Sequence, residues 1–244
     1  MYPVLPFGPM TIPTAPLVTL VAVVLGLEIA GRYGKRFGLT IDDVWNIGLL
    51  TILAGLIVAR LWNVIQFWPI YAAEPWLILS IRPSGFATWP GIFAGLVMAF
   101  GYMVRHALNP MAIVLSHAVG VTVSAAVMQM GMLLTGDLLG LPTDLPWAVA
   151  YYGELRHPVA IYYAIGLLLA VVLLWYATPL TSPVHLLAFL LLTISIVYLF
   201  FGAFEDNAIS FGSLRLKQVG ALCLALCATF VLARSATFNV DEEP

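Results

Sequence analysis

Seven apolar runs, each long enough to cross a lipid bilayer, constrain this 244-residue chain more than any other feature. A membrane-spanning helix needs roughly 20 mostly apolar residues. The runs are continuous rather than alternating, so they predict helices and not the strands of a membrane barrel. We expect one all-α domain over residues 1–244, a polytopic membrane bundle of seven transmembrane helices. The runs cover about 14–33, 42–68, 86–105, 111–134, 158–178, 184–204 and 214–233.

The composition agrees with a lipid environment and excludes other classes. Hydrophobic residues make up 62% of the chain and charged residues 9%, whereas a soluble domain carries about 25% charged residues. The formal net charge of −2 excludes a basic nucleic-acid-binding module and a polybasic membrane-surface protein. We therefore expect the lipid bilayer as a partner and no nucleic acid.

The charges in the loops predict the sidedness. Cytoplasmic loops carry an excess of Lys and Arg, and the first loop holds Arg32, Lys35 and Arg36. We therefore expect the N-terminus outside and the C-terminus inside. The segment before the first run is rich in proline and lacks a positively charged start, so that run is expected to be retained. The outward loops are the longer ones and are expected to carry any chemistry, at about 69–85, 135–157 and 205–213.

Several short patterns predict helix ends and local pairs. Thr40 and Asp43 form a capping-box pattern at the start of the second run, and Asn109–Pro110 marks the start of the fourth. Glu28 and Arg32 have the i, i+4 spacing of an ion pair.

Cys223 and Cys227 lie four apart in an apolar run, which indicates small buried apolar residues rather than a metal or redox pair. No metal-binding set and no cofactor motif is visible.

Arg60 lies well inside the second run, where a charge is costly and should have a partner. Asn63 is three residues on and shares its helix face. Arg60 and Asn63 are therefore candidate ligands of a phosphate or carboxylate, because a planar guanidinium suits anionic oxygens. The alternative is a structural arginine that is paired with a carboxylate or directed outward.

The longest loop, GDLLGLPTDLPW from Gly136 to Trp147, contains the glycines and prolines of a fixed loop. Asp137 is a candidate for chemistry or for a turn. Arg156 and His157 precede the fifth run, where an arginine can bind an anion and a histidine can act as a base. The alternative for both is an interfacial pair at a helix start.

Glu205 and Asp206 end the sixth run and are expected to pair with Arg60, Arg156 or Arg215, or to take part in catalysis.

The order of these segments resembles the bacterial phosphatidylglycerol–prolipoprotein diacylglyceryl transferases nearly end to end. The most specific match is GDLLGLPTDLPWAV at 136–149, followed by Arg156-His-Pro158 and Tyr162, which is similar to the family's GELxGxPTDLPWAV…RHPxQLYE. Four further segments resemble the family less specifically: PVLPFGPMTI at 3–12, GKRFGLTIDDV at 34–44, ARL at 59–61 and GSLRLKQ at 212–218.

The resemblance implies transfer of a diacylglyceryl group from phosphatidylglycerol to the lipobox cysteine thiol of a prolipoprotein, in the multi-pass setting of the bacterial plasma (inner) membrane. The implied partners are phosphatidylglycerol and the signal-peptide region of the prolipoprotein, and no metal or cofactor is implied. Catalytic roles fall on Asp137, Arg156 and His157. Phospholipid binding falls on the following residues: Arg60, Asn63, Gln129, Gly136 and Gly140.

The chain departs from the family pattern at several polar positions. Trp89 stands where the family carries a histidine, Gln129 stands for an arginine, and Met132 stands for an asparagine. An amide can hydrogen-bond a phosphate oxygen but cannot neutralise it. Two hypotheses follow. One is an active, divergent diacylglyceryl transferase, and the other is a catalytically impaired relative that binds a lipid or lipopeptide.

Overall fold

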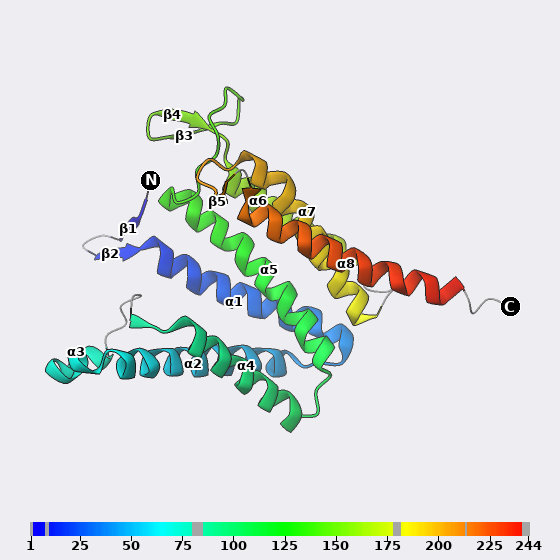
Figure 1. Ribbon diagram of the computed structural model, residues 1–244, viewed down its shortest axis with the longest axis horizontal. Coiled ribbons are helices and arrows are strands. Elements are labelled where there is room, and N and C mark those ends of the chain that lie inside the picture. The colour runs from blue at the N-terminus through cyan, green and yellow to red at the C-terminus, as the bar shows by residue number, and fades with distance from the viewer. Residues whose placement is uncertain (1, 8–9, 80–84, 178–181, 213, 241–244) are drawn as a thin grey trace.

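The computed structural model describes residues 2–7, 10–79, 85–177, 182–212 and 214–240. Each apolar run forms a helix (Figure 1). The long helices are α1 (Thr14–Gly34), α2 (Ile41–Gln66), α4 (Thr88–Arg105), α5 (Pro110–Thr135), α6 (Val159–Ala177), α7 (Pro183–Phe201) and α8 (Leu216–Val240). The short helices are η1 (Lys35–Phe37), α3 (Trp68–Ala73), η2 (Pro75–Leu79) and η5 (Gly202–Phe204).

Six of the described helices are long and apolar enough to cross a membrane, which confirms a multi-pass helical protein. The exception is α4, which is 18 residues long, begins with Thr88, Trp89 and Pro90 and ends on Arg105. The seventh span and the sides of the two termini stay predictions. Arg82, which the sequence places in an outward loop, lies outside the described residues.

Three two-stranded antiparallel hairpins occur in the described loops, where sequence analysis expects only helices and loops. Their strands are β1 (Val4–Phe7) with β2 (Met10–Pro13), β3 (Val149–Tyr151) with β4 (Glu154–Arg156), and β5 (Ser210–Phe211) with β6 (Leu214–Arg215). The second hairpin turns at Tyr152 and Gly153, both of which have positive φ angles. It brings Arg156 opposite Val149.

The predicted helix ends are confirmed by their hydrogen bonds. The Thr40 hydroxyl accepts from the Asp43 amide at 3.0 Å, and the Asp43 carboxylate accepts from the Thr40 amide at 3.2 Å. The Asn109 side chain accepts from two amides in the first turn of α5. The Glu28–Arg32 ion pair is also present, at 2.7 Å. The contacts at Thr40 and Asn109 satisfy backbone amides that have no partner within the helix itself.

Helix α5 is the centre of the bundle and packs between α1 and α6 (Figure 1). Gly26 of α1 and Gly120 of α5 let these two backbones approach closely, since a Cβ on Gly120 would lie 2.6 Å from the Gly26 carbonyl oxygen. Small residues play this role between membrane helices because they bring backbones into van der Waals contact. Tyr33, Leu115 and Leu174 are among the fully buried residues of the adjoining core.

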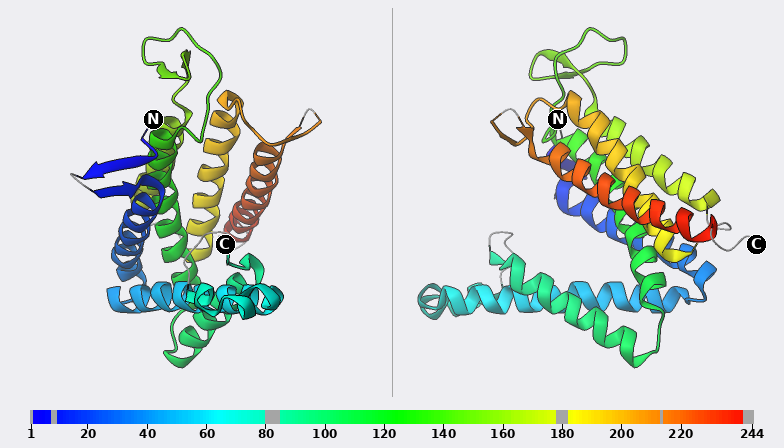
Figure 2. Two further views of the ribbon diagram at one scale, coloured as in Figure 1. Left: turned by 90° about the vertical axis from the view of Figure 1, so that its left-hand side faces the viewer. Right: turned by 45° about the vertical axis from the view of Figure 1, so that its right-hand side comes forward.

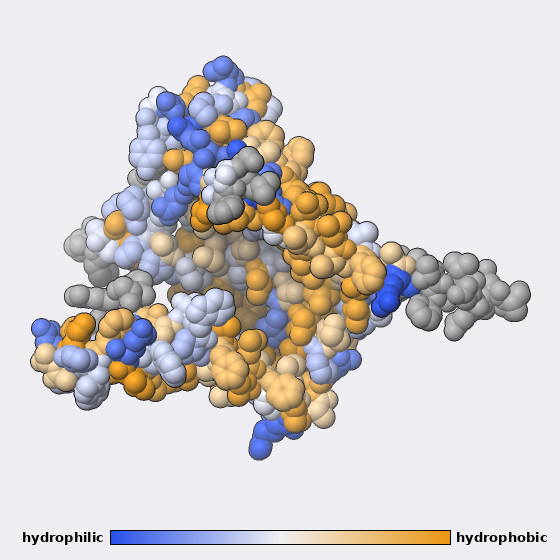
Figure 3. Space-filling model, in the orientation of Figure 1, coloured by the Kyte–Doolittle hydropathy of each residue, from blue (hydrophilic) through white to orange (hydrophobic). Residues whose placement is uncertain are grey.

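Helices α2 and α4 pair with each other and lie across the other long helices (Figure 2). Apolar side chains cover the visible face over α7 and α8, whereas hydrophilic residues gather around the β3–β4 loop (Figure 3). The expected burial of Cys223 and Cys227 was wrong, since both are exposed on α8. The reason is that α8 packs mainly against α7, so much of its apolar surface remains on the outside.

Candidate functional site

The loop after α5 and the segment after η5 meet through their backbones. The Leu141 amide donates to the Phe204 carbonyl, and the Asp206 amide donates to the Leu139 carbonyl, both at 2.9 Å. An antiparallel bridge joins Gly140 to Glu205 between these two bonds. Residues far apart in the sequence are therefore held in one small backbone unit above the ends of α5, α6 and α7 (Figure 1).

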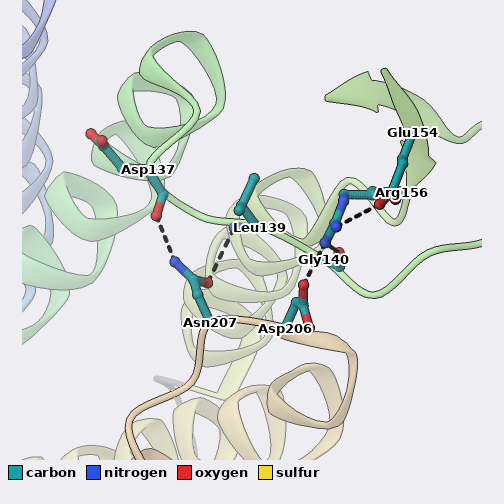
Figure 4. Close-up of polar contacts among 7 residues, drawn as sticks. All are labelled: Asp137, Leu139, Gly140, Glu154, Arg156, Asp206 and Asn207. Carbon is teal, nitrogen blue, oxygen red and sulfur yellow. Dashed lines mark hydrogen bonds and ion pairs between the residues drawn. The ribbon is translucent and has the colours of Figure 1, made fainter. Parts of the chain in front are cut away.

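Asn207 closes one end of this unit with its side-chain amide (Figure 4). Its Nδ2 donates to the Asp137 carbonyl at 3.0 Å, and its Oδ1 accepts from the Leu139 amide at 3.2 Å. One amide side chain thus makes the two hydrogen bonds that a neighbouring strand would make, one to the residue before Leu138 and one to the residue after it. This arrangement fixes the start of the loop directly after α5.

Arg156 closes the other end with its guanidinium (Figure 4). Nη1 donates to Asp206 Oδ2 at 2.5 Å and to the Gly140 carbonyl at 3.1 Å, and Nη2 donates to Glu154 Oε2 at 2.6 Å. The bond to Asp206 and the pairing with Glu154 raise the pKa of Arg156. The Arg156 side chain is 15% exposed, and its Nε is buried without a hydrogen-bond partner in the described part of the chain.

Two glycines shape this loop for different physical reasons. Gly136 ends α5 in the left-handed region, at φ 78°, where a side chain is unfavourable. Gly140 passes so close to the start of α6 that a Cβ would lie 2.2 Å from the His157 carbonyl oxygen. The structure thus gives both glycines a backbone role, and their contribution to phospholipid binding stays a prediction.

Asp137 and His157 flank the unit without contacting Arg156 through their side chains. The Asp137 carboxylate accepts from the Thr135 hydroxyl at 2.5 Å, and Figure 4 shows it directed away from Arg156. His157 Nδ1 lies 3.3 Å from the Tyr162 hydroxyl. That hydroxyl also accepts from Trp147 Nε1 at 2.7 Å. The loop therefore brings Asp137, Arg156 and His157 into one region, but on different sides of it.

Arg60 and Asn63 form a second, separate polar group on α2. Arg60 Nε donates to the Ile78 carbonyl at 3.0 Å and Nη1 to the Gly85 carbonyl at 2.7 Å, while Nη2 donates to the Leu77 carbonyl. The guanidinium also lies over the Tyr71 and Phe86 rings, with its Cζ 5.2 and 5.6 Å from their centroids.

Asn63 is buried, and its Oδ1 accepts from the Tyr71 hydroxyl at 2.7 Å. Within the described ranges, no hydrogen bond or ion pair joins Arg60 or Asn63 to the loop that carries Arg156. Arg60 thus has the partner that a membrane arginine requires, but the partner is a set of backbone carbonyls rather than a carboxylate. This geometry favours the structural alternative for Arg60.

Gln129 lies on α5, about two helical turns before Gly136. The residue is 8% exposed, and its Oε1 has no hydrogen-bond partner among the described residues. The two other departures from the family pattern lie at the surface, since Trp89 is 81% and Met132 37% exposed. Gln129 is therefore the one of the three that is buried within the bundle.

Sequence reasoning anticipated part of the pairing around residues 205 and 206. The Asp206–Arg156 pair was one of the expected pairs and is confirmed. Glu205, however, pairs with Lys217 at 3.0 Å, and Glu154 also binds Arg156. The signal for Glu154 was its spacing of two residues from Arg156 after a Tyr-Gly turn. No local signal links Glu205 to Lys217, because twelve positions and a hairpin separate them.

Comparison with known proteins gives a match over nearly the whole chain. The family model described as prolipoprotein diacylglyceryl transferase matches residues 3–234. A Clostridioides difficile protein named phosphatidylglycerol–prolipoprotein diacylglyceryl transferase is 27% identical over 225 residues, with 91% of each chain covered. A Finegoldia magna protein of the same name is 22% identical over 217 residues, with 88% of this chain and 87% of the relative covered.

Proposed function

Because the chain belongs to the prolipoprotein diacylglyceryl transferase family, we propose that it transfers a diacylglyceryl group from phosphatidylglycerol to the lipobox cysteine thiol of a prolipoprotein. The sulfur attacks the glyceryl carbon that bears the phosphate, a carbon–sulfur bond forms and the carbon–oxygen bond breaks. Glycerol phosphate leaves with the electron pair, and the thiol proton passes to a base. The match over residues 3–234, which includes the Gly136–His157 region, carries this proposal.

The setting of the reaction follows from its substrates. Phosphatidylglycerol reaches the protein from the surrounding bilayer, and the signal-peptide region of the prolipoprotein lies in the same membrane. A multi-pass protein with outward polar loops suits such a reaction, because the headgroup and the thiol meet at the membrane surface. We place this protein in the bacterial plasma membrane, with the Arg156 loop facing outward.

Two buried polar atoms motivate a headgroup site: one is in the Arg156 loop, and the other is on α5, about two turns before Gly136. In the part of the chain that the structure describes, Arg156 Nε is a donor without an acceptor, and Gln129 Oε1 is an acceptor without a donor. A buried polar group left unpaired typically costs about 1–3 kcal/mol. A glycerol phosphate headgroup carries both complements, since its phosphoryl oxygens accept and its hydroxyls donate. Arg156 would then act as a hydrogen-bond donor to the leaving phosphate, with its charge already balanced by Asp206 and Glu154.

The base has two candidates. His157 can accept the thiol proton on a ring nitrogen, and its contact with Tyr162 orients the ring. Asp137 is the second candidate, because the only hydrogen bond of its carboxylate in the described region comes from Thr135. Both lie in the loop that also holds Arg156. In either case the thiolate, which is the reactive nucleophile, would form at the loop that carries Arg156.

The second candidate function is that of an impaired relative that binds a lipid or lipopeptide without transfer. Two observations favour it. Arg60 has backbone carbonyls around its guanidinium, and Arg156 already contacts two carboxylates. Arg60 thus directs each of its nitrogens at a backbone carbonyl, and the charge of Arg156 is already balanced by carboxylates. This alternative predicts binding of anionic lipid without a covalent product.

Expression in bacteria depleted of their own transferase separates the two candidates. We expect a co-expressed prolipoprotein to gain the mass of one diacylglyceryl group, because the chain supplies the missing transfer step. Intact-protein mass spectrometry measures the gain, and a prolipoprotein with its lipobox cysteine replaced by serine is the control. A correctly inserted protein that yields no mass gain would exclude the transferase and leave the binding protein.

Replacing Gln129 by leucine should lower transfer by about tenfold, the effect of a lost hydrogen bond to the substrate, while raising stability by about 1 kcal/mol. The gain in stability is expected because leucine removes a buried oxygen that has no hydrogen-bond partner among the described residues. Mass-based transfer assays and thermal unfolding in detergent measure the two effects. Thr51→Val is the matched control, since Thr51 Oγ1 is also buried and has no partner within the described ranges. It should change stability alone, and equal activity of both variants contradicts a role for Gln129.

A further inference from the structure

Glu205 is the most deeply buried acid among the described residues, with 1% exposure. Its carboxylate accepts three hydrogen bonds from two groups. The Tyr163 hydroxyl donates to Oε1 at 2.7 Å, and Lys217 Nζ contacts Oε1 at 3.1 Å and Oε2 at 3.0 Å. The mechanism proposed above gives this acid no role. A buried carboxylate with this many partners has a fixed position, because any movement breaks several charge-assisted hydrogen bonds at once.

Lys217 belongs to a wider contact between the end of α7 and the start of α8, whereas Tyr163 reaches Glu205 from α6. Arg215 Nη1 donates to the Gly202 carbonyl, and Gln218 Nε2 donates to the Leu199 carbonyl at 2.9 Å. Three side chains from residues 215–218 therefore bind the segment 199–205. Lys217 is the charged member that reaches the buried carboxylate, with its own side chain 45% exposed.

The backbone of Glu205 lies directly opposite Gly140. The next two residues supply the side chains that hold the loop after α5. Asp206 binds Arg156, and Asn207 binds the Asp137 carbonyl and the Leu139 amide. The side chain of Glu205 thus points into the bundle while its neighbours contact the loop. Fixing this one residue sets the position of the two that follow it.

We propose that Glu205, held by Lys217 and Tyr163, is a positioning residue that places Asp206 and Asn207 against residues 137–141 and Arg156. The start of α8, which is remote in sequence from Arg156, thus determines the geometry of the Arg156 loop. Only the expected effect on transfer activity rests on the proposed function.

Hydrogen exchange on the purified full-length protein in detergent tests the structural content directly. Glu205→Gln and Lys217→Met should each speed exchange of the Leu139 and Leu141 amides by about tenfold or more, because their acceptors lie on residues 204–207. Lys217→Arg should restore slow exchange, since it keeps the charge. The control is Asp42→Asn, because Asp42 is an exposed acid in the first turn of α2. Unchanged exchange at both amides overturns the proposal, as does equal acceleration throughout α1 and α5.

A double-mutant cycle tests the effect on transfer. If Glu205 acts through Asp206, then Glu205→Gln combined with Asp206→Asn should lose no more activity than the worse single variant, whereas independent effects would multiply. Multiplied losses overturn the positioning role. A wild-type protein without transfer activity would refute the proposed function alone, and the exchange measurement would still decide the role of Glu205.

Discussion

Replacing Arg156 by alanine should lower diacylglyceryl transfer by about 100- to 1,000-fold, the loss typical for a donor that stabilises a developing oxyanion. Arg156 is bound by Asp206, Glu154 and the Gly140 carbonyl, and its buried Nε, which has no acceptor among the described residues, can donate to a phosphoryl oxygen. Alanine removes that donor and leaves two carboxylates without their shared cation. Both effects oppose the departure of an anionic glycerol phosphate.

The arginine geometry, and not only its charge, is expected to matter. Arg156→Lys should keep less than about a tenth of the wild-type transfer activity, because lysine lacks the planar guanidinium fork. A single ammonium cannot hold Asp206 and Glu154 while directing a further donor at the substrate. The measurement is the prolipoprotein mass gain per unit of inserted protein.

The control for Arg156 is Arg105→Ala, since Arg105 is an exposed residue in the last turn of α4. Its removal should leave transfer within about twofold of wild type, as is usual for surface substitutions. Full activity of Arg156→Ala, with normal insertion, would contradict the role of the guanidinium. Transfer would then depend on residues other than Arg156.

The helices could be predicted from the sequence because their signal is local. A continuous apolar run of about 20 residues has few alternatives in lipid. The caps at Thr40 and Asn109 were also readable, because each involves residues at most three positions apart. Even so, the apolar pattern did not predict which face of a helix is inside. Cys223 and Cys227 were expected to be buried and are exposed, since lipid-facing and protein-facing surfaces are equally apolar.

Some residues of the Arg156 loop were predictable from the sequence, but their contacts were not. Arg156 and Gly140 were identified from the motif, and the structure joins them through a hydrogen bond. Arg60 was expected to have a partner, but sequence alone does not reveal that a loop would fold back and present three carbonyls. Glu205 and Lys217 meet only because of how α7 and α8 pack. Such pairings depend on tertiary structure and leave no periodic trace in the sequence.

Gly140→Ala should nearly abolish transfer through a single added methyl group. The new Cβ would lie 2.2 Å from the His157 carbonyl oxygen and 2.8 Å from His157 Cβ. Backbone atoms cannot rotate out of the way, so the loop must shift. A shift breaks the bonds from the Leu141 amide to the Phe204 carbonyl and from the His157 amide to the Leu141 carbonyl. Arg156 and His157 then lose the positions that these backbone bonds give them.

A displacement of about 1 Å at catalytic groups can cost about 100-fold in rate, and that is the loss expected here. Crowding of this kind should also lower the free energy of unfolding by about 1–3 kcal/mol. Transfer assays and thermal unfolding in detergent measure the two effects separately. Gly220→Ala in α8 is the matched control, because its Cβ would have no neighbour within 4 Å. The control should unfold at the same or a higher temperature and keep its activity, since alanine favours a helix over glycine. Equal activity of the Gly140 and Gly220 variants would mean that the close approach of residues 140 and 157 has no part in transfer.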